Sequence, residues 1–377
     1  MAPNSDGVCP EYRLRAFFSV DLAGSTAFKA GAGSAAVADA RSEPLWVRTT
    51  RNFYREFPKM VERSYIVGER GDLSSLFPKV WKTVGDEILL CCRIIDLHHL
   101  AHCVRAFLEA LRQYGERLDG SGRHLDVKGA AWLAAFPHPN VTVSLRDVKL
   151  SADQFDEAFE AAADNSPRDV DFLGNGIDCG FRVAGRSATD RCTVSIELAW
   201  LLAEASERKM FRGFEFKYHD RHQLKGVLRD KPYPIFSLDT ERSYDRQQTR
   251  IYEQKLNGSQ DIKPAHVRDF ILHFMKESAV ELPRLAMGEG NWTASFPASY
   301  VEFRENWLAD AESLRLARLT EEEAEQPDKA GGTDELPAAV VDDLAEIVDE
   351  LKQQERAKRE EAYTPDSEGM RKPAKGI

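Results

Sequence analysis

The sequence of 377 residues lacks several features that mark membrane, secreted or zinc-binding proteins. It has no apolar stretch of the roughly 18 residues needed to span a bilayer. Residues 1–7 (MAPNSDG) lack the basic and apolar regions of a signal peptide. The six cysteines show no CxxC spacing and most lie in apolar runs, so we expect reduced core residues rather than zinc ligands or a disulfide framework. These absences predict a cytoplasmic protein without a membrane span.

Two further classes of protein are disfavoured by what is missing. Basic residues are not in excess, since the formal net charge is −11, which argues against nonspecific nucleic-acid binding as the main function. The Walker pattern GxxxxGKS/T is absent, and residues 31–33 (GAG) are too weak a motif to indicate a phosphate loop. The length suits a soluble enzyme with one large domain or two modest ones and an ample core.

Two aspartates beside apolar runs are the most informative feature that is present. Asp21 follows residues 17–20 (FFSV), which predict a buried strand, and precedes a small-residue turn at 22–26 (LAGST) that leads into a helix. A carboxylate there lies beside the free backbone N–H groups of a helix start, where phosphate oxygens bind readily. Asp86 lies in residues 79–91 (KVWKTVGDEILLC), two short apolar strands broken by glycine and aspartate, which indicates a hairpin.

The two carboxylates indicate a two-metal site for nucleotide chemistry. Mg²⁺ and Mn²⁺ prefer oxygen ligands, and carboxylates from neighbouring strands can bridge a metal pair roughly 3.5–4 Å apart. A plainer role is also open for each residue. Asp86 fits a solvated turn, and Asp21 fits a helix N-cap.

A third segment, residues 171–184 (DFLGNGIDCGFRVA), turns these two motifs into an ordered set. In this order the three segments resemble the catalytic domain of class III nucleotide cyclases. Within that superfamily four motifs are similar to those of the pyrimidine cyclases of bacterial Pycsar antiphage systems; they are FFSVDLAGST, VWKTVGDEILL, KGAAWLAAFP and FLGNGIDCGFR. The resemblance covers roughly residues 12–240 and implies an α+β, ferredoxin-like fold built on a split βαβ sheet.

The hydrophobic pattern agrees with that fold. It predicts a strand, a helix, two strands, a helix and a strand, which is the order a split βαβ sheet requires. We expect a helix at 35–63 that Pro44 and Pro58 interrupt, and further helices at 96–118, 177–188 and 265–280. We also expect a strand at 125–136, a strand leading into a helix at 193–204, closing strands at 214–218 and 233–238, and an insertion at 137–170 with a helical patch at 152–163.

The composition divides the chain into three parts. A catalytic domain at 12–240 is followed by a helical extension at 241–319. From 320 to 377 the composition turns acidic, which predicts a disordered or partner-dependent tail that contains one helical stretch at 337–362.

A cyclase needs in-line attack of the ribose 3′-hydroxyl on the α-phosphate, with pyrophosphate as the leaving group. This chemistry needs little covalent participation by protein, because metal ions and fixed cations supply most of the stabilisation. By resemblance, Asp21 and Asp86 bind two divalent ions, Mn²⁺ or Mg²⁺, together with the backbone carbonyl of Leu22. The loop of Gly24, Ser25 and Thr26 would hold phosphates through its N–H groups.

The resemblance places two basic residues on the substrate and shows one departure. Arg182 matches the arginine that contacts the α-phosphate in the transition state, although a surface arginine is the plainer interpretation. Lys225 matches a triphosphate-binding lysine, and a solvated hairpin lysine suits it equally. Asp178 stands where the family usually has asparagine, four residues before Arg182. An ionised aspartate only accepts hydrogen bonds, so it would accept from a ribose hydroxyl or pair with Arg182, unless the site is degenerate.

Lys82 and Asp171 match the two positions that read the base in this family. A cationic donor and a carboxylate acceptor suit adenine, cytosine and uracil, so polarity does not choose the base. Trp81 and Phe172 are candidates for the bulk that a pyrimidine site needs, although both fit the core equally well. We expect UTP, with CTP second, on the resemblance to Pycsar cyclases.

The resemblance also implies a partner and a setting. Homodimeric members of the family share each active site between two subunits, and the cyclic product would act on a separate effector after phage infection. Three other functions remain open from the sequence. They are a purine cyclase of ordinary signalling, a non-catalytic nucleotide sensor and, because residues 84–88 (VGDEI) approach a GGDEF turn, a diguanylate cyclase.

Overall fold

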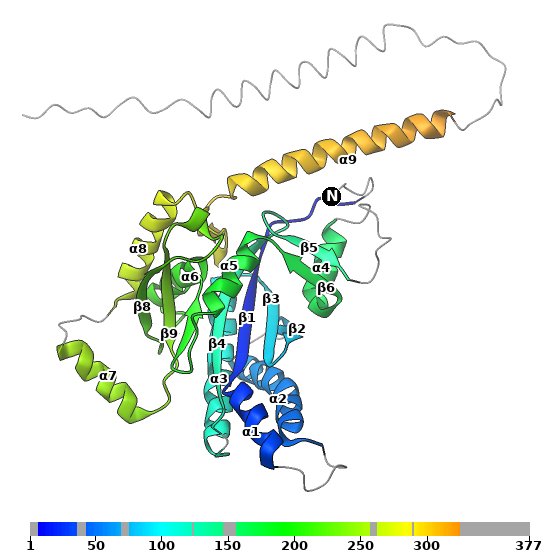
Figure 1. Cartoon of the computed structure of the whole chain (residues 1–377). Coiled ribbons are helices and arrows are strands. Elements are labelled where there is room, and N and C mark those ends of the chain that lie inside the picture. Colours follow the sequence, from blue (N-terminus) through cyan, green and yellow to red (C-terminus); the bar gives the residue numbers. More distant parts are fainter. Residues whose placement is uncertain are drawn as a thin grey trace, which may run out of the picture. The chain divides into compact units, whose positions relative to one another are not determined.

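A seven-stranded sheet with the order β2-β3-β1-β4-β7-β9-β8 forms the centre of the molecule (Figure 1). This computed structural model describes residues 7–35, 43–68, 75–122, 124–145, 156–256, 262–288 and 290–324. The strands of the sheet are β1 (Arg13–Ala23), β2 (Lys79–Val84), β3 (Glu87–Ile94), β4 (Asp126–Phe136), β7 (Arg191–Val194), β8 (Phe216–His222) and β9 (Tyr233–Asp239). Neighbouring strands are antiparallel except β4 and β7, which are parallel.

The first four strands form the split βαβ arrangement. Along the chain, β1 is followed by two helices, the β2–β3 hairpin, one helix and β4, while the spatial order is β2-β3-β1-β4. The helices are α1 (Ser25–Ala35), α2 (Leu45–Gly68) and α3 (Leu97–Asp119). The predicted α+β, ferredoxin-like fold is therefore confirmed.

Strand β1 is apolar on both faces because both faces of the sheet are covered. Phe18 points to the side of α2 and α3, where its ring centroid lies 5.0 Å from that of Phe107. Phe17 points to the other side and stacks on Trp132 with 5.6 Å between ring centroids. Successive residues of a strand alternate between faces, so one continuous apolar run contributes to two separate hydrophobic clusters.

The second face carries the insertion that follows β4. Its elements are β5 (Val141–Ser144), α4 (Glu157–Asn165), the 3₁₀ turn η3 (Pro167–Asp169), β6 (Val170–Leu173) and α5 (Asn175–Ala184). Two fully buried arginines of β1 anchor α4. Arg15 pairs with Glu160 at 2.7 Å, and Arg13 pairs with Asp164 at 2.7 Å and with Glu157. Buried charges of this kind require such partners.

The remaining elements follow β7. They are α6 (Ile196–Glu207), the 3₁₀ turn η4 (Leu228–Asp230), α7 (Tyr244–Leu256), α8 (Pro264–Glu277), β10 (Ala286–Gly288), β11 (Asn291–Trp292) and α9 (Ala298–Ala324). Helix α8 packs against α6, so residues beyond 240 contribute to the core. The described residues up to Arg318 form one compact unit. The acidic tail was predicted to start at 320, whereas α9 continues to Ala324. The rest of that tail, 325–377, with the helix predicted at 337–362, lies outside the described residues.

Helix α2 differs most from the prediction. The prediction placed a helix at 35–63 with interruptions at Pro44 and Pro58, whereas α2 starts at Leu45, directly after Pro44, and continues through Pro58 to Gly68. Proline removes one hydrogen bond from a helix. The apolar side chains of this helix are fully buried at the spacing of one face, which outweighs that loss; they are Phe53, Phe57, Val61 and Tyr65.

Smaller differences concern element ends. The helical patch predicted at 152–163 is α4, which starts at Glu157, and the helix predicted at 177–188 is α5, which ends at Ala184. Strand β1 continues two residues past Asp21 to Ala23. None of the described helices combines the length and hydrophobicity that a membrane span requires.

Candidate active site

Asp21 and Asp86 lie at the same end of the sheet. Asp21 pairs across β1 with Glu87 of β3 on one side and Lys128 of β4 on the other. Asp86 forms the turn between β2 and β3, and its backbone carbonyl accepts a hydrogen bond from the N–H of Leu22 at 3.3 Å. This bond fixes the turn against the last residues of β1, so the two predicted metal ligands come from adjacent segments.

The turn after β1 leads directly into α1. Gly24 has φ +83°, and a Cβ there would lie only 2.7 Å from the carbonyl oxygen of His124, so the turn requires glycine. Helix α1 starts at Ser25, which excludes Asp21 as its N-cap. The hydroxyl of the buried Ser25 donates to Oδ2 of Asp86, whereas Thr26 is exposed. The first N–H groups of α1 have no partner within the helix and are suited to phosphate oxygens.

Three carboxylates and two lysines determine the charge at this end of the sheet. Lys128 Nζ lies 2.9 Å from Oδ2 of Asp21, and Lys29 Nζ lies 3.8 Å from Oδ1 of Asp86. Burial raises the pKa of the Glu87 carboxyl, and the neighbouring Asp21 and Asp86 raise it further, although a hydrogen bond from Ser19 opposes the shift. Glu87 and Lys128 were not predicted as site residues, although both lie in motifs named above, VWKTVGDEILL and KGAAWLAAFP.

The donor set fits hard divalent cations. The Asp21 and Asp86 side chains are 29% and 28% exposed, so their oxygens are accessible. The Lys128 ammonium group beside Asp21 shows that a cation is favourable at this position. Among the described residues, no three His, Cys, Asp or Glu side chains are grouped to hold a metal. Two carboxylates and a backbone oxygen would therefore need water or substrate oxygens to complete a coordination shell.

Lys82 and Asp171 come together although they are 89 residues apart in the sequence. Lys82 Nζ, on β2, lies 2.7 Å from Oδ1 of Asp171, on β6, and both side chains are partly exposed. Lys82 Nζ also lies 4.0 Å from the ring centroid of Trp81. A donor and an acceptor thus stand side by side, in the arrangement that could recognise the edge of a base.

Trp81 and Phe172 belong to the core beneath that pair. They are 2% and 1% exposed, and their ring centroids lie 5.2 Å apart. The Trp81 indole donates to the carbonyl of Val170 at 3.3 Å. The two rings therefore support Lys82 and Asp171 from below rather than line an open base pocket.

Helix α5 carries Asp178 and Arg182 on its exposed side. A Cβ on Gly180 would lie 2.3 Å from the Trp132 ring, so the glycine allows α5 to approach β4 closely. Neither Asp178 nor Arg182 has a side-chain hydrogen bond or ion pair among the residues that the structure describes. The salt bridge between them that the sequence left open is not formed.

Lys225 is exposed in the loop between β8 and β9, where Gly226 follows it with φ +76°. Within the described part of the chain, no hydrogen bond or ion pair joins Lys225, Asp178 or Arg182 to the other predicted site residues. The fold thus assembles two groups, Asp21 with Asp86 and Ser25, and Lys82 with Asp171. It leaves three predicted residues outside both groups.

No family model and no curated protein matches the chain. Matches were found among solved structures. The adenylyl cyclase CyaB from P. aeruginosa is 13% identical with a TM-score of 0.41, over 62% of this chain and 97% of that chain. The guanylate cyclase domain of RhGC from Catenaria anguillulae, in complex with GTP, is 14% identical with a TM-score of 0.37, over 62% and 100%. A bacterial light-regulated adenylyl cyclase is 11% identical with a TM-score of 0.38, over 65% and 99%.

Proposed function

We propose that this protein is a nucleotide cyclase that converts a nucleoside triphosphate, UTP before CTP, to the 3′,5′-cyclic nucleotide and pyrophosphate. The observation that carries the proposal is the position of Asp21 and Asp86. Their segments are joined by a backbone hydrogen bond, and the N-terminus of α1 adjoins them. Carboxylates for metals and N–H groups for phosphates are the two requirements for binding a metal–triphosphate substrate.

In the proposed reaction the ribose O3′ forms a bond to the α-phosphorus while the bond from that phosphorus to the bridging oxygen breaks. The hydroxyl proton is released and pyrophosphate leaves. Asp21 and Asp86 would hold two divalent ions, Mn²⁺ or Mg²⁺, with the Leu22 carbonyl. When bound, the ions would supply a lowered pKa of the 3′-hydroxyl and neutralisation of the triphosphate. Gly24, Ser25 and Thr26 would orient the phosphates through backbone N–H groups.

Lys82 and Asp171 would bind the base edge. Their polarity suits uracil O4 and N3–H, and it suits cytosine and adenine as well. The preference for a pyrimidine, and the proposal that the cyclic product acts on a separate effector in antiphage defence, rest on the similarity of four motifs to Pycsar cyclases. A purine cyclase is the second candidate because the ion pair would accept adenine.

The remaining substrate contacts would come from a second copy of the chain. Asp178, Arg182 and Lys225 are exposed and make no side-chain contact with either assembled group among the described residues. A homodimer in which each site combines Asp21 and Asp86 of one subunit with Lys82, Asp171 and Arg182 of the other would account for the separation of Arg182 from the two aspartates. In this arrangement Arg182 would stabilise charge on the α-phosphate as the bond breaks.

Product identification tests the proposal. Purified protein is incubated with each of the four ribonucleoside triphosphates and Mn²⁺, and cyclic products are identified by mass. We expect cyclic UMP as the main product, and about 10²–10³-fold less of it from an Asp86→Asn variant. Cyclic AMP as the dominant product would contradict the pyrimidine assignment. Release of no pyrophosphate from any substrate would favour a nucleotide sensor, a function that Asp178 in place of asparagine would suit.

A further inference from the structure

A cavity of about 750 Å³ lies at the end of the sheet opposite the metal-binding aspartates. Leu14, near the start of β1, lines this cavity, whereas Asp21 lies seven residues further along the same strand. At a rise of about 3.3 Å per residue the two positions are about 23 Å apart. The volume is in the range of pockets that hold small organic molecules. The cavity is therefore separate from the proposed catalytic site.

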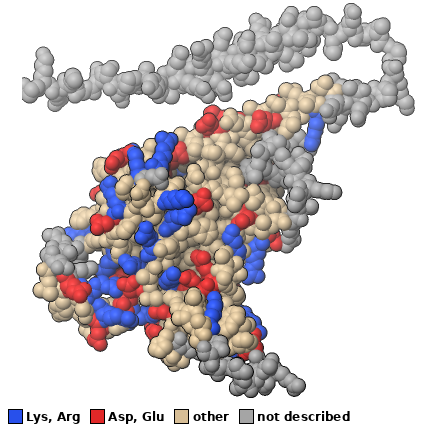
Figure 2. Space-filling view, in the orientation of Figure 1, with Lys and Arg blue, Asp and Glu red and all other residues tan. Residues whose placement is uncertain are grey.

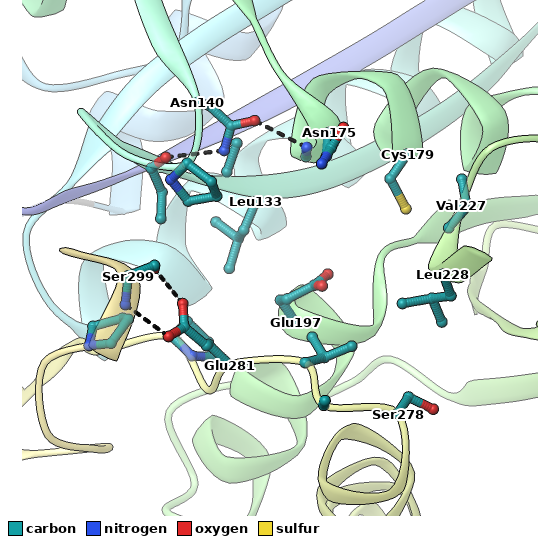
Figure 3. Close-up of a pocket in the computed structure, with 18 of the residues that line it drawn as sticks. Leu133, Asn140, Asn175, Cys179, Glu197, Val227, Leu228, Ser278, Glu281 and Ser299 are labelled. Atoms are coloured by element: carbon teal, nitrogen blue, oxygen red, sulfur yellow. Dashed lines mark hydrogen bonds between the residues drawn. The ribbon is translucent and has the colours of Figure 1, made fainter. Parts of the chain in front are cut away.

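Three segments distant in the sequence form much of the wall (Figure 3). Asn175, Gly176 and Cys179 of α5 lie on one side, residues 226–229 of the loop after β8 on another, and residues 277–283 after α8 on the third. This last wall comes from the part of the chain that follows the predicted catalytic domain.

Glu197 extends into the cavity from the first turn of α6 (Figure 3). Burial raises the pKa of its carboxyl, and only its own N–H group and the Ser195 hydroxyl oppose that shift. No lysine, arginine or histidine among the described residues forms an ion pair with it. An acidic side chain in the first turn stabilises a helix, which accounts for a glutamate at position 197. It does not account for the cavity that the carboxylate faces. Glu197 is partly exposed, to the cavity, and an ionised carboxylate that is partly shielded from water is stabilised by a cationic partner.

The rest of the lining indicates the body of such a partner. Leu133, Val227, Leu228 and Leu282 present apolar surface around the carboxylate. Glu281, which also lines the cavity, is engaged by the N–H and hydroxyl of Ser299. Arg229 and Lys231 lie on the loop wall, but both are exposed, so water and salt screen their charges.

We propose that this cavity binds a small organic cation, an amine or amidine on a compact apolar body, through a charge-assisted hydrogen bond to Glu197. The binding does not depend on the function proposed above. A consequence for catalysis does depend on it. Cys179 follows Asp178 on α5, and Gly226 follows Lys225, so an occupied cavity would hold the two elements that carry Arg182 and Lys225.

The experiment is a calorimetric titration of the full chain with benzamidine, a cationic amidine, and with benzamide, its neutral counterpart. Benzamidine is expected to bind the wild-type protein at least tenfold more tightly than the Glu197→Gln variant, while benzamide binds both equally weakly. Calorimetry needs no turnover, so the result is independent of cyclase activity. No benzamidine binding to the wild-type protein, or equal binding to wild-type and Glu197→Gln proteins, would overturn the proposal.

A second variant covers the case in which Glu197→Gln does not fold, which its thermal unfolding without ligand would reveal. Ser278 lines the cavity at the end of α8, and its hydroxyl is not needed to cap that helix. Ser278→Phe would fill space while leaving Glu197 unchanged. It is expected to weaken benzamidine and benzamide alike. Unchanged benzamidine affinity in Ser278→Phe contradicts the cavity as the binding site.

Discussion

Lys82 of β2 and Asp171 of β6 form an ion pair with 2.7 Å between Nζ and Oδ1, across 89 residues of sequence. Each group satisfies the hydrogen-bonding capacity of the other, and the side chains of Lys82 and Asp171 are 35% and 27% exposed. A base that bonds to this pair replaces one partly solvated contact with two directed hydrogen bonds. The pair is therefore well placed to determine nucleotide affinity and contributes little to folding.

Replacement of Lys82 by alanine is expected to raise KM for the nucleotide by about 10- to 100-fold, since loss of a hydrogen bond to a charged group costs about 1.5–3 kcal/mol. Stability should change by at most about 1 kcal/mol, as for other exposed ion pairs. Steady-state kinetics and urea unfolding measure the two effects. Lys79→Ala is the matched control, because Lys79 is on the same strand and its Nζ donates to the carbonyl of Asn165 at 3.2 Å. Equal KM values for both variants would remove Lys82 from the substrate site.

Asp21→Asn and Asp86→Asn are expected to lower kcat by about 10²–10³-fold. A divalent ion stabilises the transition state by several kcal/mol, and each 1.36 kcal/mol of activation free energy changes the rate by a factor of ten. Activity measured as a function of Mn²⁺ concentration should show weaker metal activation as well. Asp220→Asn, an exposed carboxylate on β8, serves as the control. Full activity of either metal-site variant would contradict the two-metal assignment.

Shared active sites predict recovery of activity on mixing. Asp21→Ala and Arg182→Ala proteins should each be inactive. An equimolar mixture should regain about a quarter of the wild-type rate, because half of the dimers are mixed and each mixed dimer has one intact site. The mixture is assayed after subunit exchange, with a double variant Asp21→Ala/Arg182→Ala as the partner that cannot rescue. A mixture as inactive as its components would place the whole site in one chain.

Gly180 and Gly31 should respond in opposite ways to alanine. A Cβ at Gly180 meets the Trp132 ring at 2.3 Å, so α5 must move and we expect a loss of about 1–3 kcal/mol in unfolding free energy. Nothing lies within 4 Å of a Cβ at Gly31 in α1, so Gly31→Ala is expected to gain up to about 1 kcal/mol from helix propensity. Urea unfolding compares them. Similar values would show that the contact of α5 with Trp132 is not tight.

Glu197 predicts a pH dependence of stability. Its folded-state pKa is raised above the ordinary value of 4.5 by burial, so the folded protein holds this proton more tightly than the unfolded chain does. Wild-type stability should therefore decrease as the pH rises from about 4.5 through the raised pKa, whereas Glu197→Gln should lack this decrease. Cys179 and Tyr233 face the same carboxyl, and their own pKa values are raised, so they titrate only at higher pH. Parallel stability curves for the two proteins would contradict the assigned burial.

The sequence predicted the parts of the fold and site that depend on local patterns. The Gly85 turn, the continuous apolar run of β1 and the helical pattern of α3 are local signals, and all are confirmed. Pro58 misled the prediction because burial of one helix face depends on tertiary packing.

Residues whose position depends on distant segments were harder to predict. Lys128 reaches Asp21 only through the pairing of β1 with β4, and the residues that line the Glu197 cavity come from several distant parts of the chain. Neither arrangement leaves a periodic signal in the sequence. The roles of Arg182, Asp178 and Lys225 came from the family resemblance and stay predictions.

The two arginines at the start of β1 make α4 an obligatory part of the sheet. Arg13 and Arg15 are fully buried, and their carboxylate partners Glu157, Glu160 and Asp164 all come from α4. A shortened chain without that helix would lose the counter-ions of both guanidinium groups and expose the apolar cluster that Phe159 and Ala163 of α4 help to cover. The sequence pattern indicates that the segment after β4 is an insertion, yet the smallest part of the chain that folds stably should contain α4.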